Sequence, residues 1–80
     1  MAEVTLNSLE PGERGTIVRL TTTAANVRRR LLEMGLIRGT PIELVRSAPM
    51  GDPIEVRVKG YRLSIRREEA ESVLVIKDVE

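Results

Sequence analysis

The chain has 80 residues, a length that fits one domain better than two. Hydrophobic residues make up 41% and charged residues 31% of it, a balance typical of a soluble globular protein and not of a disordered one. Histidine and cysteine are both absent, which removes the usual general base near neutral pH, the thiolate nucleophile, the disulfide bond and the commonest zinc ligands.

Tyr61 is the one aromatic residue, so the core is expected to consist of Val, Ile, Leu and Met side chains. No apolar run approaches the ~20 residues that span a bilayer, and no signal-peptide core follows Met1. We therefore expect a cytoplasmic protein that does not insert into a membrane.

The net charge of +1 is unevenly distributed along the chain. Residues 26–67 contain ten Arg and Lys against four acidic residues, whereas residues 68–80 contain one Lys against five acidic residues. The basic middle either provides ordinary solvated charge on strand and helix exteriors or forms a face for an acidic partner.

Turn residues and β-branched residues predict the first elements. Residues 6–13 predict a helical or irregular turn closed by Pro11-Gly12, because Pro fixes φ and Gly accepts a positive φ at successive turn positions. Residues 14–20 are rich in β-branched side chains and predict a strand. The three threonines that follow, residues 21–23, offer hydroxyl groups that can cap a helix.

A short helix is expected over about residues 24–34. Its apolar residues recur on one face at the helical period: Ala24, Val27, Leu31 and Met34. Gly35 suits the left-handed position that follows a helix. Leu32 lies roughly 120° from the centre of the apolar face. It either rests on a neighbouring strand or forms an exposed apolar anchor rimmed by arginine, as at protein-binding hot spots.

From residue 40 the hydrophobic period changes to two, which predicts three successive antiparallel strands. The apolar positions are Ile42 and Leu44, then Ile54, Val56 and Val58, then Tyr61, Leu63 and Ile65. A tight turn at Gly60 joins the last two strands, and a longer turn spans residues 47–53. A helical turn is expected over 67–72 and a closing strand over 73–76.

These elements predict a mainly β fold. We expect a small, partly open barrel of about five antiparallel strands with one inserted short helix, forming a single domain over residues 1–80.

Asp52 and Glu55 are the acidic residues near the longer turn. Two carboxylates could bind a hard cation weakly or transfer protons, whereas an aspartate before Pro53 commonly organises a turn through bonds to its own backbone. We favour the turn. We predict no catalytic residue, no cofactor and no metal ligand.

Arg28, Arg29 and Arg30 form a basic triplet on the predicted helix. Arginine suits phosphate groups, but single-strand binding uses aromatic stacking platforms and duplex binding uses a helix placed in the major groove. Only Tyr61 could stack, so we expect no nucleic-acid partner. Met50, at the tip of the longer turn, is either an adaptable contact residue or an apolar residue without a role.

Four segments, together with Ala70, resemble the FeoA family: Leu31 to Leu36, Gly39 to Ile42, Ala48 to Ile54 and Gly60 to Arg66. FeoA proteins are small cytosolic components of bacterial ferrous-iron uptake. The resemblance implies an SH3-like barrel, no enzymatic activity, and a partner, FeoB, a membrane ferrous-iron transporter with a cytosolic GTPase domain. The same SH3-like domain forms the C-terminal part of iron-dependent repressors.

The resemblance and the residue patterns together suggest a partner-binding surface made of Arg28, Arg29, Leu31, Leu32, Met34, Met50 and Asp52. Leu31 and Met34 also belong to the predicted core face and would hold this surface in shape. The leading hypothesis is a non-catalytic cytosolic accessory protein that binds and modulates FeoB. The alternative is a stand-alone metal-responsive regulatory module related to the repressor domains. We expect a monomer or a weak homo-oligomer, because an exposed edge strand can self-pair.

Overall fold

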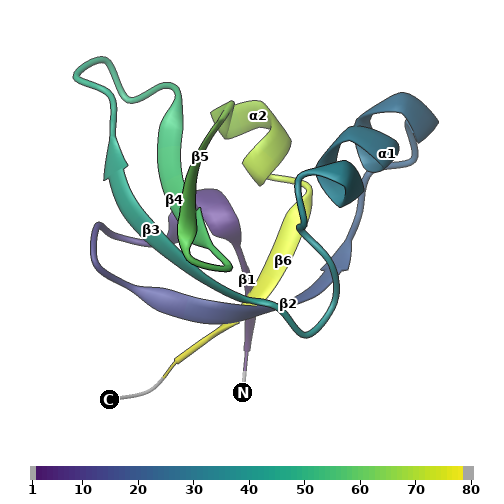
Figure 1. Cartoon of the computed structure of the whole chain (residues 1–80), viewed down its shortest axis with the longest axis horizontal. Helices are drawn as coiled ribbons and strands as arrows, with labels where there is room; N and C mark the ends of the chain where they lie inside the picture. Colours follow the sequence, from purple (N-terminus) through teal and green to yellow (C-terminus); the bar gives the residue numbers. More distant parts are fainter. Residues whose placement is uncertain (1, 79–80) are drawn as a thin grey trace.

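Strands and short helices alternate along the chain in the computed structural model, which describes residues 2–78 (Figure 1). The strands are β1 Glu3–Thr5, β2 Arg14–Leu20, β3 Pro41–Ser47, β4 Ile54–Val58, β5 Tyr61–Ile65 and β6 Val73–Lys77. The helices are the 3₁₀ helix η1 Leu6–Ser8 and the α-helices α1 Ala25–Glu33 and α2 Arg67–Ala70. Three residues of the predicted domain lie outside the described residues: Met1, Val79 and Glu80. The last two also end the predicted acidic segment.

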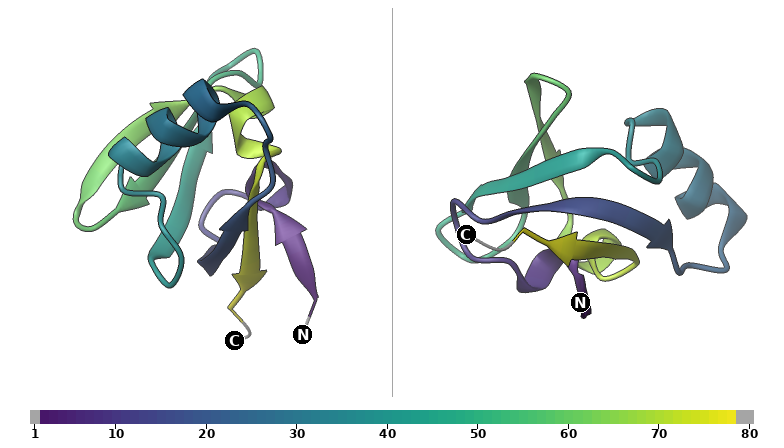
Figure 2. Two further views of the ribbon diagram at one scale, coloured as in Figure 1. Left: turned by 90° about the vertical axis from the view of Figure 1, so that its right-hand side faces the viewer. Right: turned by 90° about the horizontal axis from the view of Figure 1, so that it is seen from below.

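The six strands form one antiparallel sheet in the order β1-β6-β2-β3-β4-β5. Figure 2 shows this sheet bent round on itself, with α1 and α2 at one end and the edge strands β1 and β5 apart. The mainly β, partly open architecture is therefore confirmed. The count of about five strands is one too low, because β1 was missed: Glu3, Val4 and Thr5 pair with β6 opposite Ile76, Val75 and Leu74.

The core lies inside the curve of the sheet and is aliphatic, as the composition predicted. The inward positions of β3 and β4 are almost fully buried: Ile42, Leu44, Ile54, Val56 and Val58. The alternation weakens along β5, where Ile65 is buried, Leu63 is partly buried and Tyr61 is 47% exposed. The Tyr61 side chain is exposed to solvent because β5 is an edge strand with no strand on its other side.

Helix α1 ends just before Gly35, as the sequence predicted. Gly35 has φ of 92°, its N–H donates to Leu32 O, and the Leu36 N–H donates to Leu31 O at 3.1 Å. This pair of bonds is the Schellman motif, and the accompanying contact is apolar because Leu31 and Leu36 are both fully buried. The predicted bounds of 24–34 exceed the observed helix by one residue at each end.

The predicted threonine cap of α1 is wrong. Ala24 occupies the N-cap and no side chain caps the helix. Thr22 Oγ1 instead accepts a hydrogen bond from the Ala24 N–H at 3.2 Å, so this hydroxyl orders the segment that enters the helix. A Thr side chain readily forms such a local bond in place of a cap.

Two predicted turns are confirmed by their backbone geometry. The Glu13 N–H donates to Glu10 O at 2.9 Å around Gly12, which has φ of 91°. Lys59 and Gly60 have φ of 52° and 84°, the positive values of a two-residue turn matched to the twist of a hairpin. Tight turns at these two places fix the register of the strands that carry the surface residues discussed below.

Candidate partner-binding surface

Four large hydrophobic side chains are exposed in the described part of the chain: Leu32 (42%), Ile37 (41%), Met50 (93%) and Tyr61 (47%). Three of them lie at the C-terminal end of α1. Leu32 is in the last turn of the helix, Ile37 follows its glycine terminator, and the Tyr61 hydroxyl donates to Met34 O at 3.2 Å. We call Leu32, Ile37 and Tyr61 the α1-end patch.

Local geometry accounts for the exposure of Ile37 and the position of Tyr61. The Schellman turn directs Leu36 into the core against Leu31, which leaves the next residue, Ile37, facing outward. The Tyr61 hydroxyl satisfies a carbonyl at the end of α1, where helical carbonyls have no partner within the helix. Sequence reasoning missed both residues. Two adjacent apolar residues after a helix-ending glycine are a signal, because the turn buries only the first.

The helix residues of the predicted surface have different environments. Leu32 is exposed and Arg29 is exposed, as a contact surface requires. Arg28 is exposed but its guanidinium lies 3.4 Å from Leu20 O, to which it donates. Leu31 is fully buried and Met34 is packed against the core. Leu31 therefore cannot contact a partner directly. Leu31 and Met34 instead pack the helix against the core.

The turn residues of the predicted surface lie elsewhere. Figure 1 places the turn between β3 and β4 and helix α1 on opposite sides of the molecule. Met50 projects from the tip of that turn. The structure therefore divides the predicted surface into two regions and does not bring Met50 or Asp52 to α1.

Asp52 organises the turn by a contact that sequence reasoning did not predict. Its Oδ1 accepts a hydrogen bond from the Arg67 N–H at 3.0 Å, at the first residue of α2, where a helix has free N–H donors. The bond therefore joins the turn to α2 and does not close the turn on its own backbone.

The Arg67 side chain was not singled out from the sequence, yet it joins three segments. Its guanidinium donates to Gly51 O at 2.6 Å, to Asn7 O at 3.0 Å and to Ser47 Oγ at 3.0 Å. Arginine presents several donors in a fixed plane, which suits this role. The tip that carries Met50 is thus held by α2 and η1.

The Glu55 carboxylate is paired with two arginine side chains. Its two oxygens accept hydrogen bonds from Arg46 at 2.8 Å and from Arg62 at 3.1 Å. The bond from Arg46 is the main cause of a lowered Glu55 pKa, and Arg62 adds to it while desolvation opposes it. Residues 2–78 contain no group of three or more His, Cys, Asp or Glu side chains that could hold a metal ion.

The same part of the chain has no helix with the length and hydrophobicity that a membrane span requires.

Comparison with known proteins assigns the chain to a family. The model of the FeoA domain matches residues 4–77. A curated relative, the Fe(2+) transport protein A/Fe(2+) transporter FeoB fusion protein of Porphyromonas gingivalis, is 39% identical over 70 residues. That match covers 88% of this chain but only 8% of the fusion protein.

Solved structures agree with the fold. An FeoA-like protein from Clostridium acetobutylicum superposes with a TM-score of 0.90 at 38% identity, over 100% of this chain and 92% of that one. Stenotrophomonas maltophilia FeoA complexed with zinc, described as a prokaryotic SH3 domain protein, gives 0.79 at 30% identity, over 91% and 89%.

The predicted relation to iron-dependent repressors is also confirmed. T. acidophilum IdeR has a TM-score of 0.85 at 28% identity, over 98% of this chain and 35% of that one. The fold is accordingly SH3-like, as the resemblance implied. With a family model that spans nearly its whole length, this chain belongs to the FeoA family.

Proposed function

We propose that this protein is a non-catalytic accessory protein of bacterial ferrous-iron uptake that binds the cytosolic part of an FeoB-type transporter and modulates it. The observation that carries the proposal is the P. gingivalis fusion protein, in which an FeoA part and an FeoB part share one chain. Two proteins that are fused in one organism commonly act together as separate chains in another. A partner of this kind would place the protein in the cytoplasm.

The α1-end patch is the surface that we assign to the transporter. It combines a tyrosine and two aliphatic side chains with the neighbouring Arg28 and Arg29. Aromatic residues and arginine are enriched at the centres of protein interfaces. The bond from the Tyr61 hydroxyl to Met34 O restrains the ring before binding, which lowers the entropy lost on association.

The side-chain chemistry supports an accessory role. The chain has no histidine and no cysteine, and the two carboxylates near the longer turn are already bonded to Arg67, Arg46 and Arg62. A protein built in this way acts most simply by contact with another protein.

Calorimetric titration of the isolated cytosolic domain of the same organism's FeoB tests the proposal. We expect saturable binding by the wild-type protein and at least tenfold weaker binding, about 1.4 kcal/mol, by Leu32→Asp. Met50→Asp is the matched control, since it places the same charge on an exposed apolar residue at the opposite side of the molecule. Thermal unfolding of each variant confirms that it is folded.

The possible outcomes distinguish a wrong choice of contact surface from a wrong proposed function. If Leu32→Asp binds like the wild type while Met50→Asp loses affinity, the turn and not the α1-end patch is the contact surface. If the wild-type protein shows no binding at all, the proposed function is wrong.

A metal-responsive regulatory module is the second candidate, and the similarity to IdeR favours it. Titration with ferrous or manganous ion, followed by amide chemical shifts, tests it. A saturable response centred on Asp52 and Glu55 would support the regulator. An unchanged spectrum would leave the accessory protein as the better account.

A further inference from the structure

A row of charged side chains crosses four neighbouring strands on the outside of the sheet. Arg14 of β2 lies opposite Glu43 of β3, Glu43 opposite Arg57 of β4, and Arg57 opposite Arg62 of β5. These positions alternate along β3 and β4 with the buried core positions. Because successive side chains of a strand point to opposite faces, the row lies on the face away from the core.

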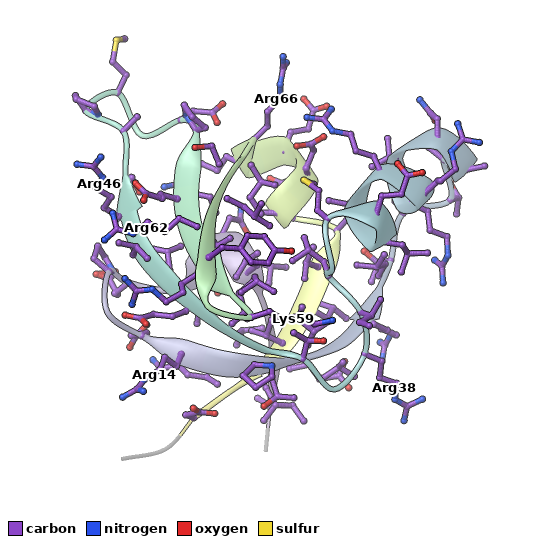
Figure 3. All side chains as sticks on the ribbon, in the orientation of Figure 1. Arg14, Arg38, Arg46, Lys59, Arg62 and Arg66 are labelled. Carbon is purple, nitrogen blue, oxygen red and sulfur yellow. The ribbon has the colours of Figure 1, made fainter. Side chains whose placement is uncertain are left out.

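Two further cations, Arg46 and Lys59, extend this row. Figure 3 shows Arg14, Arg46 and Arg62 projecting outward from the same side of the molecule. We define the outer basic face by the side chains of Arg14, Arg46, Arg57, Lys59 and Arg62 with Glu43 and Glu55. Five cations against two carboxylates give this face a net charge of +3.

Both carboxylates accept hydrogen bonds from arginines of the face. Glu43 Oε1 accepts from Arg57 at 3.1 Å, and Glu55 accepts from Arg46 and Arg62. These ion pairs order the arginines and leave an excess of positive charge. Among residues 2–78, the Arg14 and Lys59 side chains take part in no hydrogen bond or ion pair, so both are free to bind an anion.

Arg14 and Lys59 line the same hollow. This open depression of about 190 Å³ lies over β2, β3 and the β4–β5 turn, and its remaining walls come from Pro41, Ile42, Glu43, Arg57 and Gly60. Three cations thus surround a space whose one carboxylate is already bonded to one of them. A group with several negatively charged oxygens, such as a phosphate, fits that charge distribution.

We propose that the outer basic face binds an anionic lipid surface, with a headgroup phosphate in the hollow between Arg14, Arg57 and Lys59. A protein partner fits this face less well, because interface centres are depleted of charge and rich in apolar anchors. None of the four exposed large hydrophobic side chains belongs to the face. Attraction to anionic headgroups needs no apolar anchor, since each nearby Lys or Arg contributes electrostatically.

A nucleic acid also fits this face less well. Single strands are bound with aromatic platforms, and the only aromatic residue, Tyr61, bonds to the end of α1 and is absent from the face. Duplex readers insert a helix or a β-ribbon into a groove. Here the cations lie on a continuous sheet four strands wide.

The lipid contact is independent of the proposed function, because it requires no transporter. Figures 1 and 3 place Arg14, Arg46 and Arg62 on the side of the molecule away from α1. The protein can therefore lie on a membrane with the α1-end patch still accessible.

Sedimentation with lipid vesicles tests the proposal. We expect the wild-type protein to bind vesicles of phosphatidylcholine mixed with phosphatidylglycerol at low salt and not vesicles of phosphatidylcholine alone. Each basic residue near an anionic surface contributes a factor of roughly five, so Arg14→Gln combined with Lys59→Asn should weaken binding at least about tenfold. Asn is chosen because residue 59 has a positive φ, which Asn tolerates.

The matched control is Arg38→Gln combined with Arg66→Gln. It removes the same charge from exposed positions outside the outer basic face, and we expect vesicle binding within about twofold of the wild type. Lys59→Asn alone, at an exposed turn, gives a second test if the double variant fails to fold. It should weaken binding by roughly fivefold.

Three results would overturn the proposal. The first is no difference between neutral and anionic vesicles, including no binding to either. The second is an equal loss in the control variant, which would make the effect one of net charge. The third is tighter binding to duplex DNA than to anionic vesicles at the same salt, which would make a polynucleotide the partner.

Discussion

Gly15 is the residue at which the sheet leaves no space for a side chain. A Cβ built there would lie 2.7 Å from the backbone oxygen of Ile76 on β6, closer than real Cβ atoms come to such an atom. Because backbone and not a flexible side chain blocks the site, β2 and β6 would have to separate. The close approach of β2 and β6 at this point thus requires a glycine.

We predict that Gly15→Ala lowers the free energy of unfolding by about 1–3 kcal/mol, the usual cost of overpacking. Urea denaturation followed by circular dichroism measures this change. Ser64→Ala, on the exposed face of β5, is the control and should stay within about 0.5 kcal/mol of the wild type. A variant as stable as the wild type would show that the two strands can separate without cost.

At the scale of elements, the sequence predicted those strands and helix ends that local residue patterns determine. Alternating apolar residues placed β3, β4 and β5, and Gly35 marked the end of α1. Strand β1 could not be predicted in the same way, because its three residues have no pattern and become a strand only by pairing with β6. The prediction of a threonine cap failed for a related reason: three candidate hydroxyls preceded α1, and one of them forms a local hydrogen bond to the Ala24 N–H instead of capping the helix.

Gly35→Ala tests the end of α1. A residue with a Cβ at φ of 92° is strained by roughly 1–2 kcal/mol, and the new Cβ would lie 3.3 Å from the Tyr61 hydroxyl. We therefore expect the melting temperature to fall and the amide shifts of Leu36 and Ile37 to move. Unchanged shifts at these two residues would mean that the glycine does not control the position of Ile37.

Arg67→Met tests the attachment of the β3–β4 turn. The change removes donors to Gly51 O, Asn7 O and Ser47 Oγ, and we expect a loss of at least about 2 kcal/mol of unfolding free energy. Amide hydrogen exchange should also accelerate in the turn. Arg66→Met, at the exposed neighbouring position, should change stability by less than about 0.5 kcal/mol. Equal effects of the two variants would contradict the assigned role of Arg67.

At the scale of the whole molecule, two carboxylates make stability depend on pH. The pKa of Glu13 is lowered chiefly by its bond with Lys77, whose Nζ lies 2.6 Å away, and that of Glu55 chiefly by Arg46. A carboxylate with a lower pKa in the folded state stabilises the fold above its unfolded pKa of about 4.3. That contribution is lost as the pH falls through the folded value.

We accordingly expect unfolding free energy to decline as the pH falls below the unfolded pKa of about 4.3 and through the lowered folded values, with a smaller decline in Glu55→Gln. Glu55→Gln should be less stable than the wild type at neutral pH, and the two should converge in acid. Urea unfolding at several pH values measures both effects. Parallel curves for the two proteins would contradict the assignment of Glu55.

Which residues form the candidate site could be established only from the whole fold. Leu32 could be predicted because its angle on a helix follows from its position in the sequence. Tyr61 could not, because it follows the inward alternation of β5 and is exposed only where the sheet remains open. Met50 and Asp52 were grouped with the helix residues, but the path of β3 carries their turn to the other side of the molecule.

The most direct test of the central claim is the amide spectrum of this protein during titration with the cytosolic domain of FeoB. We predict saturable shifts or line broadening concentrated at Leu32, Ile37 and Tyr61, with Met50 unchanged. A spectrum that stays unchanged to saturating concentrations, or that changes only around Met50, would contradict the claim that the α1-end patch binds the transporter.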